Sequence, residues 1–119
     1  GLDSGLMIVQ YTAASIVARN KMRAMPASVD TIDSSNGQED HVSMGANSGL
    51  QLFAVIKGTQ EVLGCELLSA SQALHFRNAP GLSSKQLEWL SDFRTVVPPQ
   101  EGDAEQSHRM RLSIDFLRR

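Results

Sequence analysis

Apolar and polar positions along the chain predict four helical segments, and no stretch shows the alternation typical of a strand. The first segment extends from about Asp3, as N-cap, to about Arg23, and carries no charge from Ser4 to Ala18. A helix that is apolar on nearly every side needs neighbours around its whole circumference. We therefore expect residues 1–25 to form a buried core helix, covered by other chains or by further parts of the same chain.

The second segment is predicted to begin near Asp40 and to occupy residues 41–77, with a break between Gly45 and Gly49 as the alternative. Its apolar positions are three and four residues apart, which is the spacing of one helix face. They are Leu52, Ile56, Thr59, Leu63, Leu67, Ala70 and Leu74. Each glycine inside this segment weakens a helix by about 1 kcal/mol relative to alanine, which makes sense where another helix approaches closely.

Residues 78–119 are predicted to form two shorter helices after a turn at 78–81. Ser83 with Gln86 has the pattern of a capping box at the start of the first of them, and prolines at 98 and 99 follow its end. Asp103 with Gln106 repeats the capping pattern before the last helix. The predicted fold class is therefore all-α, a bundle of long helices.

The composition is that of a globular domain, because 41% of the 119 residues are apolar and 20% are charged. A net charge of -2 offers no basic surface, which argues against nucleic acid or an anionic membrane as partner. The uncharged run of the first segment is shorter than the roughly 20 apolar residues that span a membrane. Cys65 is the only cysteine, so an internal disulfide is impossible and a reducing, cytoplasmic setting fits best.

A long polar loop, predicted at residues 26–40, joins the first two segments and leads into Gln38, Glu39, Asp40 and His41. Connections of this length in compact domains are usually functional or disordered. Neighbouring side chains on a helix point about 100° apart, so these ionisable groups would not all face one ligand. Spacing alone also allows a structural interpretation, in which Asp40 is an N-cap, Glu39 favours the helix N-terminus and His41 is solvated.

Spacing supports neither a metal site nor a cysteine nucleophile. His41, His75 and His108 are far apart in the sequence, and no HxxxH or HExxH pattern occurs. Cys65 lies in the middle of a helical pattern, which is typical of a buried structural thiol. The polar loop therefore remains the best candidate for chemistry.

The segments PASVDTI at 26–32 and QEDHVSMG at 38–45 resemble the aromatic amino acid ammonia-lyases and aminomutases, and within that family the histidine ammonia-lyases. Flanking segments agree: GLDSGLMI at 1–8, QYTAA at 10–14, ELL at 66–68 and QALHFR at 72–77. The resemblance covers most of residues 1–77 and thins toward the end, where VPP at 97–99 and Asp103 still match. The chain departs from the family pattern at Asp33, where proline is usual, and at Gly37, where asparagine is usual.

This resemblance implies an all-helical enzyme that assembles as a homotetramer, with active sites built from more than one chain. It implies the elimination of ammonia from L-histidine to give urocanate. It also implies a methylidene-imidazolone prosthetic group, which the family forms from an Ala-Ser-Gly triad that is absent from these 119 residues. We therefore expect the chain to be the C-terminal part of a larger enzyme, inactive by itself, with the remainder of that enzyme and an amino acid substrate as partners.

The resemblance also assigns roles to the residues that end the loop. It implies that Glu39 is the catalytic residue of this chain, that Gln38 orients Glu39 or lines the substrate pocket, and that Asp40 and His41 fix the turn from loop to helix. Histidine lyases carry glutamate at the position of Glu39, whereas phenylalanine lyases commonly carry glutamine. Two alternatives stay open: a tyrosine or phenylalanine ammonia-lyase or aminomutase, and a non-catalytic helical oligomerisation module.

Overall fold

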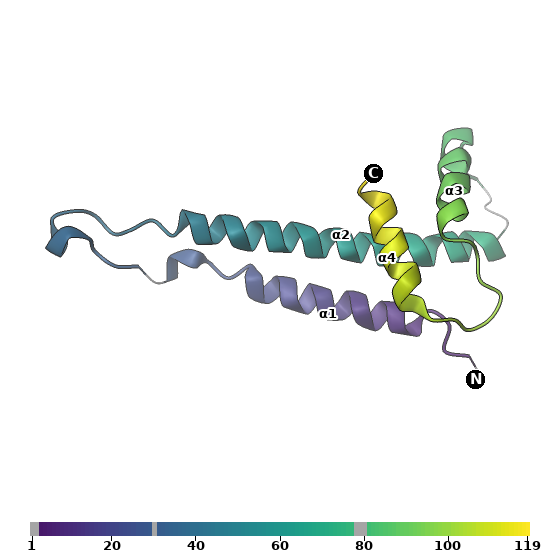
Figure 1. Cartoon of the computed structure of the whole chain (residues 1–119), viewed down its shortest axis with the longest axis horizontal. Helices are drawn as coiled ribbons and strands as arrows, with labels where there is room; N and C mark the ends of the chain where they lie inside the picture. Colours follow the sequence, from purple (N-terminus) through teal and green to yellow (C-terminus); the bar gives the residue numbers. More distant parts are fainter. Residues whose placement is uncertain (1–2, 30, 78–80) are drawn as a thin grey trace.

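The computed structural model describes residues 3–29, 31–77 and 81–119, and within them the fold is all-α. Most of the turn expected at 78–81 lies outside the described residues. The helices are α1 (Met7–Arg23), α2 (Gly45–Phe76), α3 (Ser84–Val96) and α4 (Gln106–Leu117), with short 3-10 turns η1 (Ala27–Val29) and η2 (Ser35–Gly37). Helices α1 and α2 form an antiparallel hairpin, and α3 and α4 lie toward the end of it that holds the N-terminus (Figure 1). No helix in the described ranges is long and apolar enough to cross a membrane.

The start of α1 differs from the expectation, because the helix begins at Met7 and its N-cap is Leu6. Gly5 has a φ of +55°, a left-handed conformation that stops the helix from extending toward Asp3. The carboxylate of Asp103 holds this turn by accepting the backbone N–H groups of Ser4 at 2.9 Å and Gly5 at 2.8 Å. The prediction of Asp3 as N-cap was therefore wrong.

The same contact explains why the second expected capping box does not form. With its carboxylate directed to the start of the chain, Asp103 does not cap α4, whose N-cap is Glu105, and the side chain of Glu105 makes no capping bond to the helix. Gln106 instead donates to the side-chain oxygen of Gln100 at 3.0 Å and to the carbonyl of Ala104 at 3.1 Å. The capping pattern of Asp103 and Gln106 was thus read incorrectly from the sequence.

The other capping box is present at the start of α3, as expected. The N–H of Gln86 donates to the Ser83 hydroxyl at 3.4 Å, and the N–H of Ser83 donates to the Gln86 side chain at 3.0 Å. Helix α3 then ends at Val96, just ahead of the two prolines. Both ends of α3 are determined by residues next to them in the sequence, which is why the sequence predicts them.

Helix α2 is continuous over 32 residues, about 48 Å, and contains no break at its first glycines. Two of its glycines lie where a side chain would collide with a neighbour. A Cβ on Gly64 would lie 3.0 Å from the Cα of Ile114 in α4, and a Cβ on Gly58 would overlap the Asn20 side chain of α1. The glycines therefore allow α1 and α4 to approach α2 closely, as the sequence suggested.

A small apolar core lies where α1, α2, α3 and α4 meet. Its buried residues are Val9, Cys65, Leu68, Phe93 and Val97. We call this part of the molecule the core end. Polar contacts reinforce it: the Ser113 hydroxyl donates to the Gly64 carbonyl at 2.7 Å, and the Gln72 amide exchanges two hydrogen bonds with the Gln100 backbone.

Most of the expected apolar face of α2 is not covered by this chain, and α1 buries only Val9. Leu52 is 59% exposed and Leu63 is 48% exposed. The radius of gyration is 20.5 Å, whereas a compact domain of this length has about 13.5 Å. The chain exposes 8544 Å², against about 6,300 Å² for a compact monomer of 13.0 kDa. Any further burial of these helices must therefore come from outside this chain.

Candidate functional site

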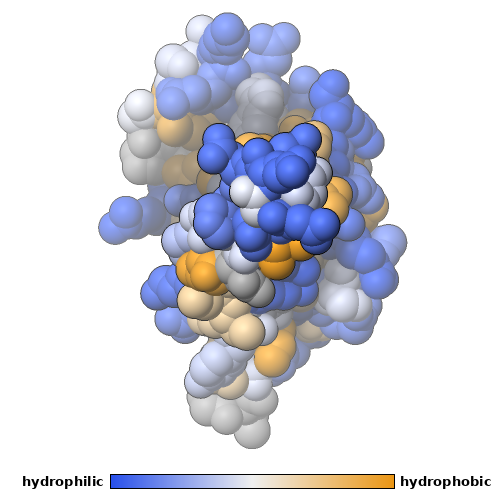
Figure 2. All heavy atoms as spheres, turned by 90° about the vertical axis from the view of Figure 1, so that its left-hand side faces the viewer, coloured by the Kyte–Doolittle hydropathy of each residue, from blue (hydrophilic) through white to orange (hydrophobic). Residues whose placement is uncertain are grey.

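The loop at residues 24–44 connects α1 to α2 at the end of the hairpin opposite the core end (Figure 1). Hydrogen bonds draw it into a narrow hairpin. The Val42 N–H donates to the Ile32 carbonyl at 2.8 Å, and the Thr31 hydroxyl donates to the Val42 carbonyl at 2.7 Å. Seen from this end, the nearest surface is mostly hydrophilic, with some apolar groups beside it (Figure 2). The loop is thus shaped mainly by polar contacts.

A left-handed turn reverses the chain inside this loop. Ser35, Asn36 and Gly37 have φ values of +52°, +54° and +78°. Two of the three carry side chains, and such residues adopt this conformation at a cost of about 1–2 kcal/mol each. A Cβ on Gly37 would also lie 3.3 Å from Oδ2 of Asp33. Glycine at 37 therefore suits both the backbone and the limited space.

This reversal brings Glu39 back beside Ser34. The Ser34 hydroxyl donates to Oε2 of Glu39 at 3.0 Å, and the Glu39 N–H donates to the Ser34 carbonyl at 3.4 Å. Glu39 itself is exposed, and one oxygen of its carboxylate is engaged by Ser34. Ser34 was not predicted from the sequence, because no helical or strand spacing indicates a contact across an irregular turn.

The other residues singled out in the sequence lie close to Glu39 but in different settings. Gln38 is exposed, and its N–H donates to the Ser35 carbonyl at 3.2 Å. Asp40 is exposed and precedes the start of α2 by five positions. His41 pairs with Asp33 in an isolated antiparallel bridge. The four residues therefore share one hairpin without sharing one side-chain cluster.

The structural interpretation of Asp40 as an N-cap was wrong. Helix α2 has Met44 at its N-cap position, and the side chain of Met44 makes no capping bond to the helix backbone. The Gly45 N–H is instead accepted by the Ser43 hydroxyl at 3.2 Å. Asp40 lies too far ahead of the helix to satisfy one of its first N–H groups.

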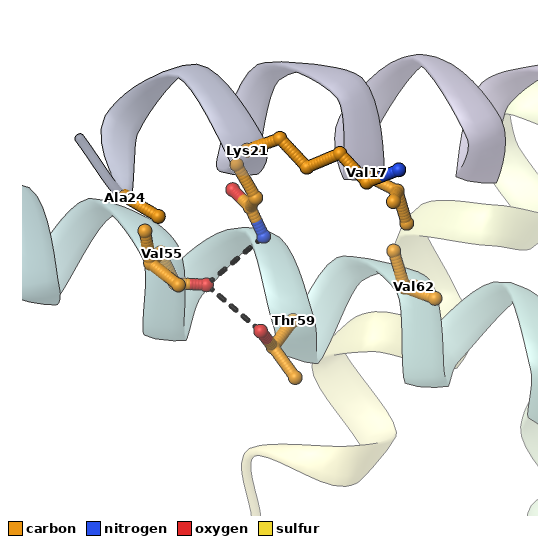
Figure 3. Close-up of a pocket in the computed structure, with 7 residues that line it drawn as sticks. Val17, Lys21, Ala24, Val55, Thr59 and Val62 are labelled. Atoms are coloured by element: carbon orange, nitrogen blue, oxygen red, sulfur yellow. Dashed lines mark hydrogen bonds between the residues drawn. The ribbon is translucent and has the colours of Figure 1, made fainter.

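A hollow lies along the seam between α1 and α2, away from the loop, with a volume of about 350 Å³ (Figure 3). Its lining is mainly apolar, and the carbonyl of Val55 at its floor accepts from the Asn20 amide at 3.2 Å and the Thr59 hydroxyl at 2.9 Å. Lys21 is the one ionisable side chain among the described lining residues. This groove offers a packing surface and lacks an acid and base pair for catalysis.

Cys65 is buried, as the sequence predicted, and its Sγ lies 3.8 Å from Sδ of Met110. Burial raises the pKa of this thiol, and the carboxylate of Glu61 adds to the effect. A protonated, buried thiol is a poor nucleophile. Within the described ranges, no three His, Cys, Asp or Glu side chains gather to hold a metal ion.

Comparison with known proteins identifies the family to which this chain belongs. Residues 1–95 match the aromatic amino acid lyases. The chain belongs to this family. Its all-α fold and its resemblance to these enzymes, both expected from the sequence, are thereby confirmed.

The similar proteins within the aromatic amino acid lyase family include histidine ammonia-lyases. The histidine ammonia-lyase of Geobacillus sp. (strain WCH70) is 47% identical over 99% of this chain, and that of Bacillus subtilis (strain 168) is 41% identical over 100% of it. The crystal structure of histidine ammonia-lyase from Trypanosoma cruzi superposes on 99% of the chain with a TM-score of 0.91 and 36% identity. This lyase chain spans 23% of the length of each of these proteins.

Proposed function

We propose that this chain is the C-terminal part of a histidine ammonia-lyase, which eliminates ammonia from L-histidine and releases urocanate. The observation that carries the proposal is the 47% identity to a histidine ammonia-lyase across 99% of the chain. The position of Glu39 supports it, because this exposed residue lies on the polar loop that joins α1 to α2. Loops held by a rigid scaffold often carry catalytic residues.

Glu39 is the catalytic residue in this proposal. Its carboxylate pairs with the ammonium group of the substrate or accepts the N–H of the imidazole ring. A charge-assisted hydrogen bond of this kind contributes about 1.5–3 kcal/mol. In the elimination, the Cα–N bond and one Cβ–H bond break, a carbon–carbon double bond forms, and the nitrogen leaves as ammonia. The base that takes the Cβ proton lies outside this chain.

The neighbours of Glu39 have supporting roles in the proposal. Gln38 orients Glu39 or lines the substrate pocket. His41 acts through its backbone, because the bridge to Asp33 fixes the base of the hairpin. Asp40 helps to shape the approach to α2 without capping it.

The methylidene-imidazolone group belongs to the proposed parent enzyme, where it would supply the electrophile that activates the substrate. None of these 119 residues fits as its source, because the sequence lacks the Ala-Ser-Gly triad. By itself the chain is therefore expected to be inactive. What it contributes is the carboxylate and the loop that presents it.

The proposal also includes assembly with the remainder of the enzyme into a homotetramer in the cytoplasm. The uncovered apolar faces of α1 and α2 support this assembly, since the chain exposes roughly 2,000 Å² more surface than a compact monomer of its mass. Obligate interfaces bury about 1,000 Å² or more on each partner, so an excess of that size is large enough for one. Light scattering of the intact enzyme tests the tetramer, and a monomeric or dimeric mass would reject it.

Replacement of Glu39 by glutamine in the intact enzyme tests the catalytic assignment. Glu39→Gln keeps the size of the side chain but removes its charge and its ability to accept a proton. We expect histidine turnover, followed by urocanate absorbance, to fall about 100-fold, which is the upper end of what the loss of one charge-assisted hydrogen bond causes. Asp40→Asn is the matched control, because it removes an exposed carboxylate one position away, and it should change turnover far less. Nearly full activity in Glu39→Gln would reject the role of Glu39.

The substrate is tested separately. L-Histidine, L-tyrosine and L-phenylalanine are offered together to the intact enzyme, and the products are quantified. Urocanate should dominate. Cinnamate or coumarate as the main product would show instead that the enzyme is a phenylalanine or tyrosine ammonia-lyase. A β-amino acid as the main product would show that it is an aminomutase.

A further inference from the structure

Ser34 and Glu39 are joined both through their side chains and through their backbones. The Ser34 hydroxyl donates to Oε2 of Glu39 at 3.0 Å, while the Ser34 carbonyl accepts the Glu39 N–H at 3.4 Å. The same carbonyl accepts the N–H of Gly37 at 3.1 Å. Ser34 is half-buried, whereas Glu39 is exposed. The less exposed residue, Ser34, therefore provides a hydrogen bond that restrains the more exposed side chain of Glu39.

The turn between them makes this contact possible. Three consecutive left-handed residues, 35–37, turn the chain back on itself within a few positions. Non-glycine residues keep such a conformation only where their surroundings determine it, and outliers of this kind gather at functional sites. Below the turn, the bond from Val42 to the Ile32 carbonyl at 2.8 Å closes the hairpin. The backbone thus places Glu39 beside the serine hydroxyl.

We propose that Ser34 is a positioning residue for the carboxylate of Glu39. Its hydroxyl holds Oε2, which leaves Oε1 as the oxygen presented to the substrate. An exposed glutamate otherwise samples many rotamers, and a carboxylate that must meet a reacting group has to be held in one orientation. This inference rests on the proposed function, because it assigns to Ser34 an effect that acts through a catalytic Glu39.

The first test is the kinetics of Ser34→Ala in the intact enzyme. Loss of the hydroxyl frees the carboxylate without removing it, so kcat should fall about 10- to 100-fold while KM changes much less, the pattern of a lost orientation at the reacting centre. Ser34→Thr keeps a hydroxyl and should restore most of kcat. Ser48→Ala is the matched control, since this exposed serine on the first turn of α2 makes no described side-chain contact with Glu39, and its kcat should stay near that of the parent.

A double-mutant cycle separates positioning from a general effect on the loop. If Ser34 acts through the carboxylate, Ser34→Ala should cause little further loss in an enzyme that already carries Glu39→Gln. Additive losses, or a Ser34→Thr enzyme as slow as Ser34→Ala, would overturn the positioning role. Full activity in Ser34→Ala together with a slow Glu39→Gln enzyme would overturn this inference and leave the proposed function intact. An active Glu39→Gln enzyme would overturn both this inference and the catalytic role of Glu39.

Discussion

At the core end, helices from opposite ends of the sequence bury Val9, Leu68 and Phe93, whereas none of the described residues between 24 and 44 is buried. The two regions lie at opposite ends of the α1–α2 hairpin (Figure 1). The core end is stabilised by the burial of apolar side chains and by glycines of α2 that allow close helix packing. Hydrogen bonds across a narrow hairpin hold the second. The same long helix, α2, connects a region that packs with a region that presents polar groups.

The two regions are stabilised by different interactions. The core end is folded by contacts within this chain, whereas the loop presents polar groups to the rest of the protein. Burial contributes about 25 cal/mol per Å² and does not depend on direction, so the core end keeps its shape through many contacts. Each hydrogen bond of the loop contributes about 0.5–1.5 kcal/mol and depends strongly on geometry. Mutations should therefore affect global stability at the core end and local order or activity at the loop.

The largest effect on stability should come from Phe93→Ala. Phe93 is fully buried in α3 and contacts the rings of Trp89 and Phe116, so its truncation leaves a cavity that costs about 3–5 kcal/mol. Leu87→Ala on the same helix is the control, because Leu87 is 45% exposed and should cost much less. Urea unfolding of the intact enzyme, followed by circular dichroism, measures both. Equal shifts in the two variants would mean that the core end is not where stability lies.

An intermediate effect is expected from alanine at two glycines of α2. Gly64→Ala introduces a Cβ about 3.0 Å from the Ile114 backbone, and overpacking of this kind costs about 1–3 kcal/mol. Gly49→Ala meets nothing within 4 Å and should instead stabilise the helix by up to about 1 kcal/mol. Thermal unfolding midpoints of the two variants should shift in opposite directions. Shifts in the same direction would contradict the close approach of α4.

The sequence correctly predicted those features of the fold that depend on residues close together in the chain. The all-α class, the capping box of Ser83 and Gln86, and the burial of Cys65 all follow from short-range pattern. The caps assigned to Asp3 and Asp103 failed because Asp103 finds its donors at Ser4 and Gly5, nearly a hundred residues away. Propensity describes a local preference, and a long-range acceptor can override it.

The candidate site shows the same limit. Adjacent ionisable residues marked the end of the loop, but their spacing did not select one of them, and Glu39 was assigned by resemblance. The contact from Ser34 depends on left-handed dihedrals at Ser35 and Asn36, and no pattern in the sequence marks Ser35 for this conformation. Irregular turns are set by the whole loop, so their side-chain contacts become visible only in three dimensions.

The smallest effect on global stability is expected at the loop. Gly37→Ala places a side chain at a φ of +78° and brings its Cβ to 3.3 Å from Asp33, a local cost of about 1 kcal/mol. Because none of the described residues between 24 and 44 is buried, that cost should appear as faster amide exchange of Gln38 and Glu39 in the intact enzyme, with the global unfolding midpoint unchanged. Gly37→Asn is the matched variant, since asparagine tolerates left-handed backbone better than alanine, and it should exchange more slowly than Gly37→Ala. If Gly37→Ala lowers the global midpoint as far as Gly64→Ala does, the loop contributes to the folded core and the contrast between the two ends fails.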